Sequence, residues 1–127
     1  MATRSRIGKR LSDGTIKSIY CHFDGYPDHN GQILKEHYKD ETKVDALLEL
    51  GDISILGPEI GEHQDFDRRE THHKDWCLAY GRDRGEKNID AEVHKHIDDM
   101  CREAYHYVYE NGEWACYGAS CQETYKL

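Results

Sequence analysis

The sequence predicts a single α+β domain over residues 1–127, with a mainly antiparallel sheet packed against about three helices. The sheet is expected to form from a hairpin at each end of the chain plus a central strand. Segments with helical spacing lie between the two hairpins, and a length of 127 residues corresponds to one domain. Strand pairs at both termini with helices between them are typical of this fold class.

The first hairpin is predicted from residues 3–11 and 15–23, which are joined by the turn sequence Ser-Asp-Gly. In its second strand, alternation places Ile16 and Tyr20 on one side and Ile19 and Phe23 on the other. Because both sides carry apolar groups, we expect this strand to lie centrally in the sheet and to be covered on both faces.

Two helices are predicted after a turn cluster at residues 23–32. The apolar positions of the first helix are Ile33, Leu34, His37 and Tyr38, and those of the second are Val44, Leu47 and Leu48. Asp40 is placed to cap the second helix, and Gly51 is placed to end it.

The middle of the chain is predicted to be less regular. Residues 52–61 are expected to contain one short turn, and residues 57–75 a long polar loop. Residues 76–81 read as a strand, followed by a charged loop. A third helix begun near Asp90 is predicted from the spacing of Val93, Ile97, Met100, Cys101 and Ala104.

The second hairpin is predicted from residues 105–118, which contain two strand segments around Asn111-Gly112, a pair typical of a type I′ turn. The core is expected to depend on aromatic residues, since Leu, Ile, Val and Phe make up only 22 of 127 residues, against nine Tyr and two Trp. Each aromatic side chain buries about 150–250 Å². Because some amphipathic rings should remain near the surface, we expect a homo-oligomer.

The net charge of −8 is uneven, because residues 1–20 carry +4 and the remainder carries −12. An acidic surface repels the phosphate backbone, so direct non-specific DNA binding is not expected. The acidic surface serves either solubility or binding to a basic groove of a partner protein.

Five cysteines, an odd number with spacings that match no small disulfide scaffold, favour reduced thiols in a cytoplasm. Cys77 and Cys101 occupy apolar-patterned positions and are expected to fill the core. No run approaches the roughly 18 apolar residues of a membrane span. No metal site is expected, because the Cys116–Cys121 gap is too wide for a zinc knuckle and no matching histidine pair accompanies it.

A charged segment after the predicted strand is the first candidate site. Arg82 and Arg84 offer planar, permanent cations suited to phosphate or carboxylate, and nearby glycines allow close approach of a ligand. We expect an anionic, nucleotide-like ligand, with Tyr80 stacking on its base. The candidate contacts are Tyr80, Arg82, Asp83, Arg84 and Glu86. In the alternative, Asp83 and Glu86 pair with the arginines in a plain connection.

A second candidate site follows the first hairpin. His22 and Asp24 are two residues apart, so on a continuing strand they would face the same way as an acid–base couple or a metal corner. Tyr26 in the same turn is a further candidate contact, and His37 is a candidate to approach from the next helix. The alternative is an Asp-Gly turn beside a hydrogen-bonded core histidine.

No nucleophile or phosphate-cradling motif accompanies these residues, since the chain lacks both G-x-S-x-G and G-x-x-x-x-G-K-[ST]. We therefore expect no enzyme activity, no catalytic residue and no cofactor.

The chain resembles a family of small, mostly uncharacterised proteins of tailed bacteriophages. The resemblance rests on five segments within residues 4–86, namely RSRIG, DGTIKSIYCHFDGYP, NGQILKEHY, LLELGDISILG and YGRDRGE, and on the two aromatic strands near the C-terminus. It implies a protein of the host cytoplasm that acts on a host protein or complex. By analogy with other small phage proteins, the expected targets are defences such as CRISPR–Cas, restriction or signalling.

The leading hypothesis is a non-enzymatic phage accessory protein that inhibits a host defence by direct binding, for example as an anti-CRISPR protein. The first alternative is a protein that sequesters a small anionic nucleotide signal. The second alternative is a metal-dependent hydrolase that uses His22, Asp24 and His37.

Overall fold

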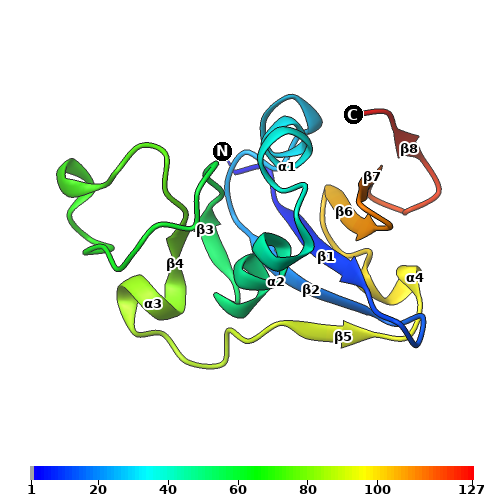
Figure 1. The fold of residues 1–127 in the computed structure, drawn as a ribbon, viewed down its shortest axis with the longest axis horizontal. Helices are drawn as coiled ribbons and strands as arrows, with labels where there is room; N and C mark the ends of the chain where they lie inside the picture. Colours follow the sequence, from blue (N-terminus) through cyan, green and yellow to red (C-terminus); the bar gives the residue numbers. More distant parts are fainter. Residues whose placement is uncertain (1) are drawn as a thin grey trace.

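The structure, a computed structural model, describes residues 2–127 as one α+β domain (Figure 1). The strands are β1 (Ser5–Arg10), β2 (Ile16–Cys21), β3 (Ile53–Ile55), β4 (Leu78–Ala79), β5 (Glu92–His94), β6 (Tyr105–Glu110), β7 (Glu113–Tyr117) and β8 (Thr124–Tyr125). The helices are α1 (Gln32–His37), α2 (Glu41–Glu49), α3 (Tyr80–Arg84) and α4 (Ile97–Met100). Two shorter turns are the π-helical η1 (Pro27–Gly31) and the 3-10 turn η2 (Arg69–Thr71).

The described strands form one eight-stranded sheet in the order β4-β3-β2-β1-β6-β7-β8, with β5 paired to β2. β3 and β5 therefore share one edge of β2, each beside a different end of it. The β1–β6 and β2–β3 pairs are parallel, and the other pairs are antiparallel. The predicted fold class, a mainly antiparallel α+β domain, is confirmed.

Both predicted hairpins are present. In the first, Ile7 of β1 lies opposite Ile19 of β2. In the second, Asn111 and Gly112 have φ values of 53° and 80°, as a type I′ turn between β6 and β7 requires. The parallel pairing of β1 with β6 joins the two hairpins in the middle of the sheet.

The helices predicted between the hairpins are also present, and α1 and α2 pack on one face of the sheet to form the main core. Asp40 caps α2 by accepting a hydrogen bond from the Thr42 backbone N–H at 3.2 Å. Gly51 has a φ of 74°, and a Cβ at this position would collide with the Ile89 backbone oxygen, so the sharp stop after α2 requires glycine.

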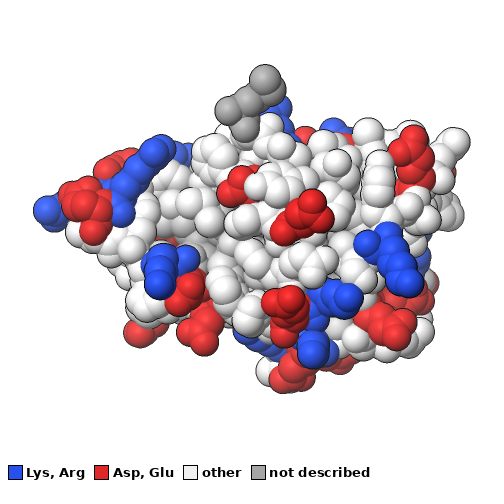
Figure 2. Space-filling view, turned by 90° about the horizontal axis from the view of Figure 1, so that it is seen from above, with Lys and Arg blue, Asp and Glu red and all other residues white. Residues whose placement is uncertain are grey.

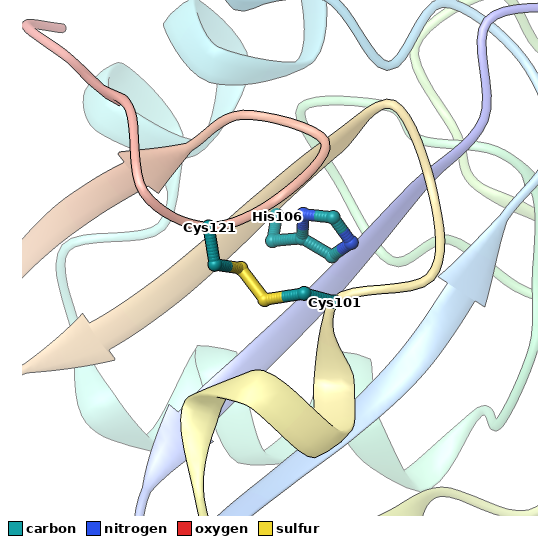
Figure 3. Close-up of side chains that lie close together, drawn as sticks. All are labelled: Cys101, His106 and Cys121. Atoms are coloured by element: carbon teal, nitrogen blue, oxygen red, sulfur yellow. A yellow bond between two sulfur atoms is a disulfide. The ribbon is translucent and has the colours of Figure 1, made fainter.

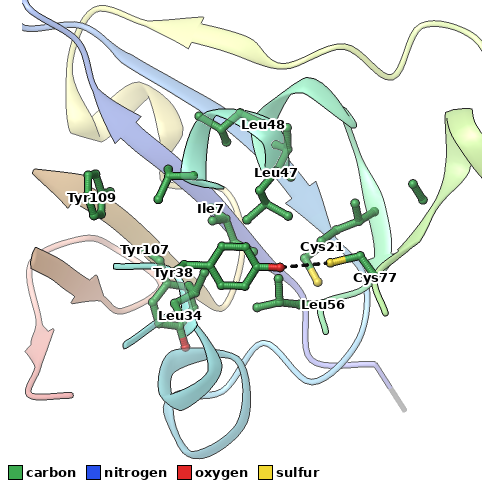
Figure 4. Packing of buried hydrophobic residues seen from close by; sticks show 14 of the residues in the cluster. Ile7, Cys21, Leu34, Tyr38, Leu47, Leu48, Leu56, Cys77, Tyr107 and Tyr109 are labelled. Atoms are coloured by element: carbon green, nitrogen blue, oxygen red, sulfur yellow. Dashed lines mark hydrogen bonds between the residues drawn. The ribbon is translucent and has the colours of Figure 1, made fainter. Parts of the chain in front are cut away.

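Tyrosines occupy the centre of this core, as expected from the composition (Figure 4). The Tyr38 hydroxyl donates to the Gly57 carbonyl oxygen at 2.7 Å and lies 3.4 Å from the Cys77 sulfur. The Tyr107 hydroxyl donates to the Gly25 carbonyl oxygen at 2.6 Å. Because these buried hydroxyls have partners within the same chain, they incur no penalty for unsatisfied polar groups. A homo-oligomer stays a prediction.

The opposite face of β2 is covered as well, which confirms its predicted central position. Met100 of α4 packs there with Ile16 and Val108. Beside them, the Arg6 side chain donates to the Ser18 hydroxyl at 2.9 Å, and this hydroxyl lies 2.8 Å from His94 Nε2. This buried network fastens β5 to β2.

Three predictions for the middle of the chain are wrong. Residues 53–55 form the strand β3, which the sequence does not predict within residues 52–61. Residues 80–84, predicted as the end of a strand and the start of a charged loop, form the helix α3. The helix predicted from Asp90 is instead the strand β5 followed by the four-residue helix α4. Val93 pairs with Lys17 of β2, and its side chain is 60% exposed. The apolar positions that suggested a helix from Asp90 therefore do not form one buried face.

The segment predicted as a long polar loop, residues 57–75, has only the turn η2 as regular structure in the described chain. It is nevertheless anchored, because the buried Gln64 side chain donates to the Cys77 carbonyl oxygen at 3.2 Å and accepts from the His73 N–H at 2.7 Å. Within residues 2–127, no helix combines the length and apolar character required to cross a membrane.

Candidate functional site

An open cleft of about 480 Å³ lies where three segments distant in sequence meet. We call it the aromatic cleft. One wall comes from the turn after β2 and from β3, another from the 66–72 part of the long loop, and the third from β4 and α3. The lining residues are Phe23, Asp24, Ser54, Ile55, Phe66, Arg69, His72, Leu78, Tyr80 and Arg84. Its volume lies in the range of about 300–1,000 Å³ that is usual for small-molecule sites.

Stacked rings with a cation above them form one side of the aromatic cleft. The ring centroids of Phe66 and Tyr80 are 5.5 Å apart and the ring planes are inclined by 30°. The Arg84 guanidinium carbon lies 4.5 Å from the Phe66 centroid and 4.9 Å from the Tyr80 centroid. These distances fall within the cation–π range of about 6 Å, and the Arg84 side chain is still 42% exposed. The arrangement presents flat apolar surface and a fixed positive charge to the same space.

The Arg84 guanidinium is paired with the Glu86 carboxylate. Gly85 has a φ of 73° at the end of α3, which turns the chain so that Glu86 returns to Arg84. The hydrogen bond to Glu86 raises the pKa of Arg84 above its ordinary value. The guanidinium is permanently charged even without this shift. Any anion that binds Arg84 competes with Glu86.

Arg82 faces the interior rather than the cleft. Its guanidinium donates to the carbonyl oxygens of Ile60 and Cys77, each at 2.8 Å, and to the Asp83 carboxylate at 2.9 Å. Asp83 is buried and also accepts from the backbone N–H groups of Gln64 at 2.8 Å and Ala79 at 2.7 Å. The predicted ligand role is therefore not supported for Arg82 and Asp83, which instead tie the long loop to β4 and α3.

The ionisation of Asp83 follows from the same contacts. Burial raises the pKa of this carboxyl, but the hydrogen bonds from Arg82 and from the backbone of Ala79 and Gln64 outweigh burial, so its pKa lies below the ordinary value. Asp83 is consequently a structural anion at neutral pH.

The second predicted site is not assembled as expected. His22 Nδ1 lies 2.8 Å from the Tyr20 hydroxyl, whereas Asp24 lies in the aromatic cleft with a φ of 57°. Asp24 in this left-handed conformation does not continue β2, which ends at Cys21, and His22 is not among the lining residues of the cleft. Tyr26 is 39% exposed beside His29, with ring centroids 5.9 Å apart, and it is not among the lining residues of the cleft. Asp24 alone of the three joins the aromatic cleft.

Seven of the ten lining residues were not predicted from the sequence, and three of these seven lie in the long polar loop: Phe66, Arg69 and His72. The available signal was Phe66, the only Phe, Tyr or Trp in residues 57–75. A large apolar ring in a polar segment indicates that the segment packs against something, here Tyr80.

A second cluster comprises Cys101, His106 and Cys121, and Figure 3 shows the two cysteines joined by a disulfide beside the histidine ring. The Cα atoms of the cysteines are 5.9 Å apart. This disulfide corrects the expectation that all thiols are reduced and that Cys101 is a core filler. Among the described residues, the only group of three potential metal ligands is Cys101, His106 and Cys121. His22, Asp24 and His37 therefore do not form such a group.

Charge is mixed on the face seen in Figure 2, where acidic side chains lie near the centre and both acidic and basic side chains lie toward the edges. The Lys9 ammonium, for example, pairs with the Asp45 carboxylate at 2.8 Å. Acidic residues of α2 are thus partly neutralised within the chain.

No protein-family model, curated protein or solved structure matches this chain, so its function is inferred from its own residues.

Proposed function

We propose that the protein acts by binding rather than by catalysis, and that its aromatic cleft sequesters a small anionic nucleotide. The observation that carries this proposal is the Arg84 guanidinium over the stacked rings of Phe66 and Tyr80. Aromatic side chains provide stacking surface for nucleobases, and the planar guanidinium fork matches a phosphate group.

Other lining residues complement a nucleotide. Arg69 adds a positive group along the loop wall, where a phosphate would benefit from it. Asp24 offers acceptor oxygens for sugar hydroxyls or base N–H groups. The apolar side chains of Phe23 and Ile55, 36% and 37% exposed, remain available to cover the rest of a base.

The proposal also fits the phage context that the sequence suggests. A phage protein that removes a nucleotide signal inhibits a host defence without touching the defence proteins. Direct contact with a host protein, including an anti-CRISPR mechanism, stays a prediction, and the face seen in Figure 2 carries mixed charge.

The test is native mass spectrometry of protein purified from phage-infected host cells, followed by titration calorimetry with the nucleotide that co-purifies. We expect one bound nucleotide per chain, and Phe66→Leu should weaken binding at least about tenfold because base stacking is lost. Tyr26→Leu is the matched control, since this exposed ring lies outside the cleft. Equal loss of affinity in both variants, or catalytic turnover of the nucleotide, would contradict the proposal.

A further inference from the structure

The cysteine–histidine cluster connects two segments that are otherwise lightly held. Cys101 immediately follows α4, and Cys121 lies in the turn between β7 and β8. We propose that the Cys101–Cys121 disulfide is reversible and serves as a redox-controlled clasp on the C-terminal segment, residues 118–127. This inference is independent of the proposed function, because none of these residues lines the aromatic cleft.

His106 holds the two cysteine-bearing turns together and is the positioning residue of the clasp. It is fully buried, its Nε2 accepts from the Glu103 N–H at 3.0 Å, and its Nδ1 lies 3.0 Å from the Gly118 carbonyl oxygen. With Nε2 as the acceptor, Nδ1 carries the proton and donates it to Gly118. Glu103 is two residues after Cys101 and Gly118 is three residues before Cys121, so these bonds keep the thiols near each other after reduction.

The remaining cysteines are unsuited to redox exchange. Cys21, Cys77 and Cys116 are all buried as free thiols. Burial raises the pKa of Cys21 to about 12 and that of Cys116 to about 11, which suppresses the reactive thiolate. Cys101 and Cys121 are partly exposed, so small-molecule thiols reach them first.

The clasp matters because the C-terminal segment has few other anchors. β8 contributes only two residues to the sheet, and its residues are exposed. The further ties of the C-terminal segment are the Tyr105–Tyr125 ring contact, at 5.6 Å between centroids, and two contacts of Leu127. The partly buried Leu127 packs against the main core, and its carbonyl oxygen accepts from the Lys35 ammonium at 2.8 Å. Tyr125 and Leu127 form part of a second cleft of about 500 Å³ with Lys35, Lys39 and Trp114. Opening the clasp would therefore loosen one wall of this cleft.

The reaction is thiol–disulfide exchange with a low-molecular-mass thiol. The thiolate attacks one protein sulfur, the protein S–S bond breaks, and a mixed disulfide forms. A second thiolate attacks the small-molecule sulfur of this mixed disulfide and releases the second protein thiol. The protein gains two electrons and two protons, and the small thiols leave as their disulfide. The reverse sequence closes the clasp.

The same atoms could instead bind a metal ion once reduced, because the three ligand atoms lie within 4.8 Å of one another. Both ring nitrogens of His106 are already committed to backbone groups, however. A metal would have to displace one of those bonds, so we infer a dithiol–disulfide pair rather than a metal centre.

The test compares full-length protein equilibrated in reduced and in oxidised glutathione. Under native conditions, a maleimide should label Cys101 and Cys121 in the reduced protein alone, and adding oxidised glutathione should reverse the change. Hydrogen exchange of residues 118–127 should be at least about tenfold faster in the reduced protein. A Cys101→Ser/Cys121→Ser variant is the control and should exchange at the reduced rate in both buffers.

The role of His106 is tested by the thiol-to-disulfide ratio at which half of the protein is reduced. In His106→Gln, half of the protein should be reduced at a thiol-to-disulfide ratio at least about tenfold lower than in the wild type, because bonds that hold the turns together are lost. If this variant does not fold, the wild-type exchange comparison decides. Equal exchange in both buffers would overturn the proposal, as would stoichiometric zinc held by the reduced wild type and absent from the Cys101→Ser/Cys121→Ser variant.

Discussion

The two arginines of α3 are only two residues apart, yet they serve different regions of the molecule. The Arg82 guanidinium donates hydrogen bonds to two carbonyl oxygens and to a buried carboxylate. Arg84 lies on the rim of the aromatic cleft, held by two rings and an exposed glutamate. A guanidinium whose N–H groups donate to buried acceptors has a structural role, whereas a guanidinium on an open aromatic surface remains available to a ligand.

The largest effect is expected from Arg82→Ala. Removing this side chain leaves Asp83 buried without its cation, and breaking such a pair costs about 3–5 kcal/mol in free energy of unfolding. Urea denaturation measures this loss. Arg84→Ala is the matched control, with an unfolding midpoint close to that of the wild type. If the two variants have similar midpoints, the division between the arginines is wrong.

The second effect concerns the pH dependence of stability. Because the folded-state pKa of Asp83 is lowered, its contribution is complete above the unfolded-state pKa of about 4 and is lost as the pH falls through the folded value. Asp83→Asn should remove this contribution at pH 7 and make the denaturation curves less dependent on pH below about 4. A difference between wild type and variant that is constant from pH 2 to about pH 7 would exclude this role for Asp83.

The third effect is on binding alone. Arg84→Ala should weaken the affinity for a nucleotide at least about tenfold, because a charge-assisted contact to phosphate is lost. Calorimetry measures the affinity, with Arg68→Ala as the control, since Arg68 is an exposed arginine of the neighbouring loop that does not line the cleft. An unchanged affinity in Arg84→Ala would remove Arg84 from the site.

The smallest effect is expected from Glu86→Gln. This change removes the carboxylate that competes with a ligand for Arg84, so affinity for a phosphate-bearing nucleotide should rise by up to about fivefold. The corresponding nucleoside, which lacks phosphate, should bind wild type and variant equally. A parallel gain for the nucleoside would show that Glu86 acts through something other than charge.

The sequence was informative where the signal is local. The Asn111-Gly112 turn, the Asp40 cap and the Gly51 stop each depend on a few neighbouring residues, and all three are present. β3 and β5 depend instead on pairing with β2, a segment more than 30 residues away in each case. Spacing of apolar residues cannot report such pairing, so β5 and α4 were predicted as one helix.

The candidate site follows the same pattern. Tyr80, Arg84 and Glu86 were identified from composition and lie at or beside the cleft. The sequence could not separate Arg82 from Arg84, because the distinction depends on the distant carbonyl of Ile60. Phe66 was missed for the same reason, since its contact with Tyr80 forms only when the long loop folds back on α3.

The most direct test of the central claim is an NMR titration of isotope-labelled protein with the co-purifying nucleotide, recorded for wild type and Arg84→Ala. Saturable shift changes centred on Ser54, Phe66 and Tyr80 are expected in the wild type, and these changes should be lost in Arg84→Ala, which remains folded. Shift changes that map elsewhere, or that persist unchanged in Arg84→Ala, would contradict the central claim.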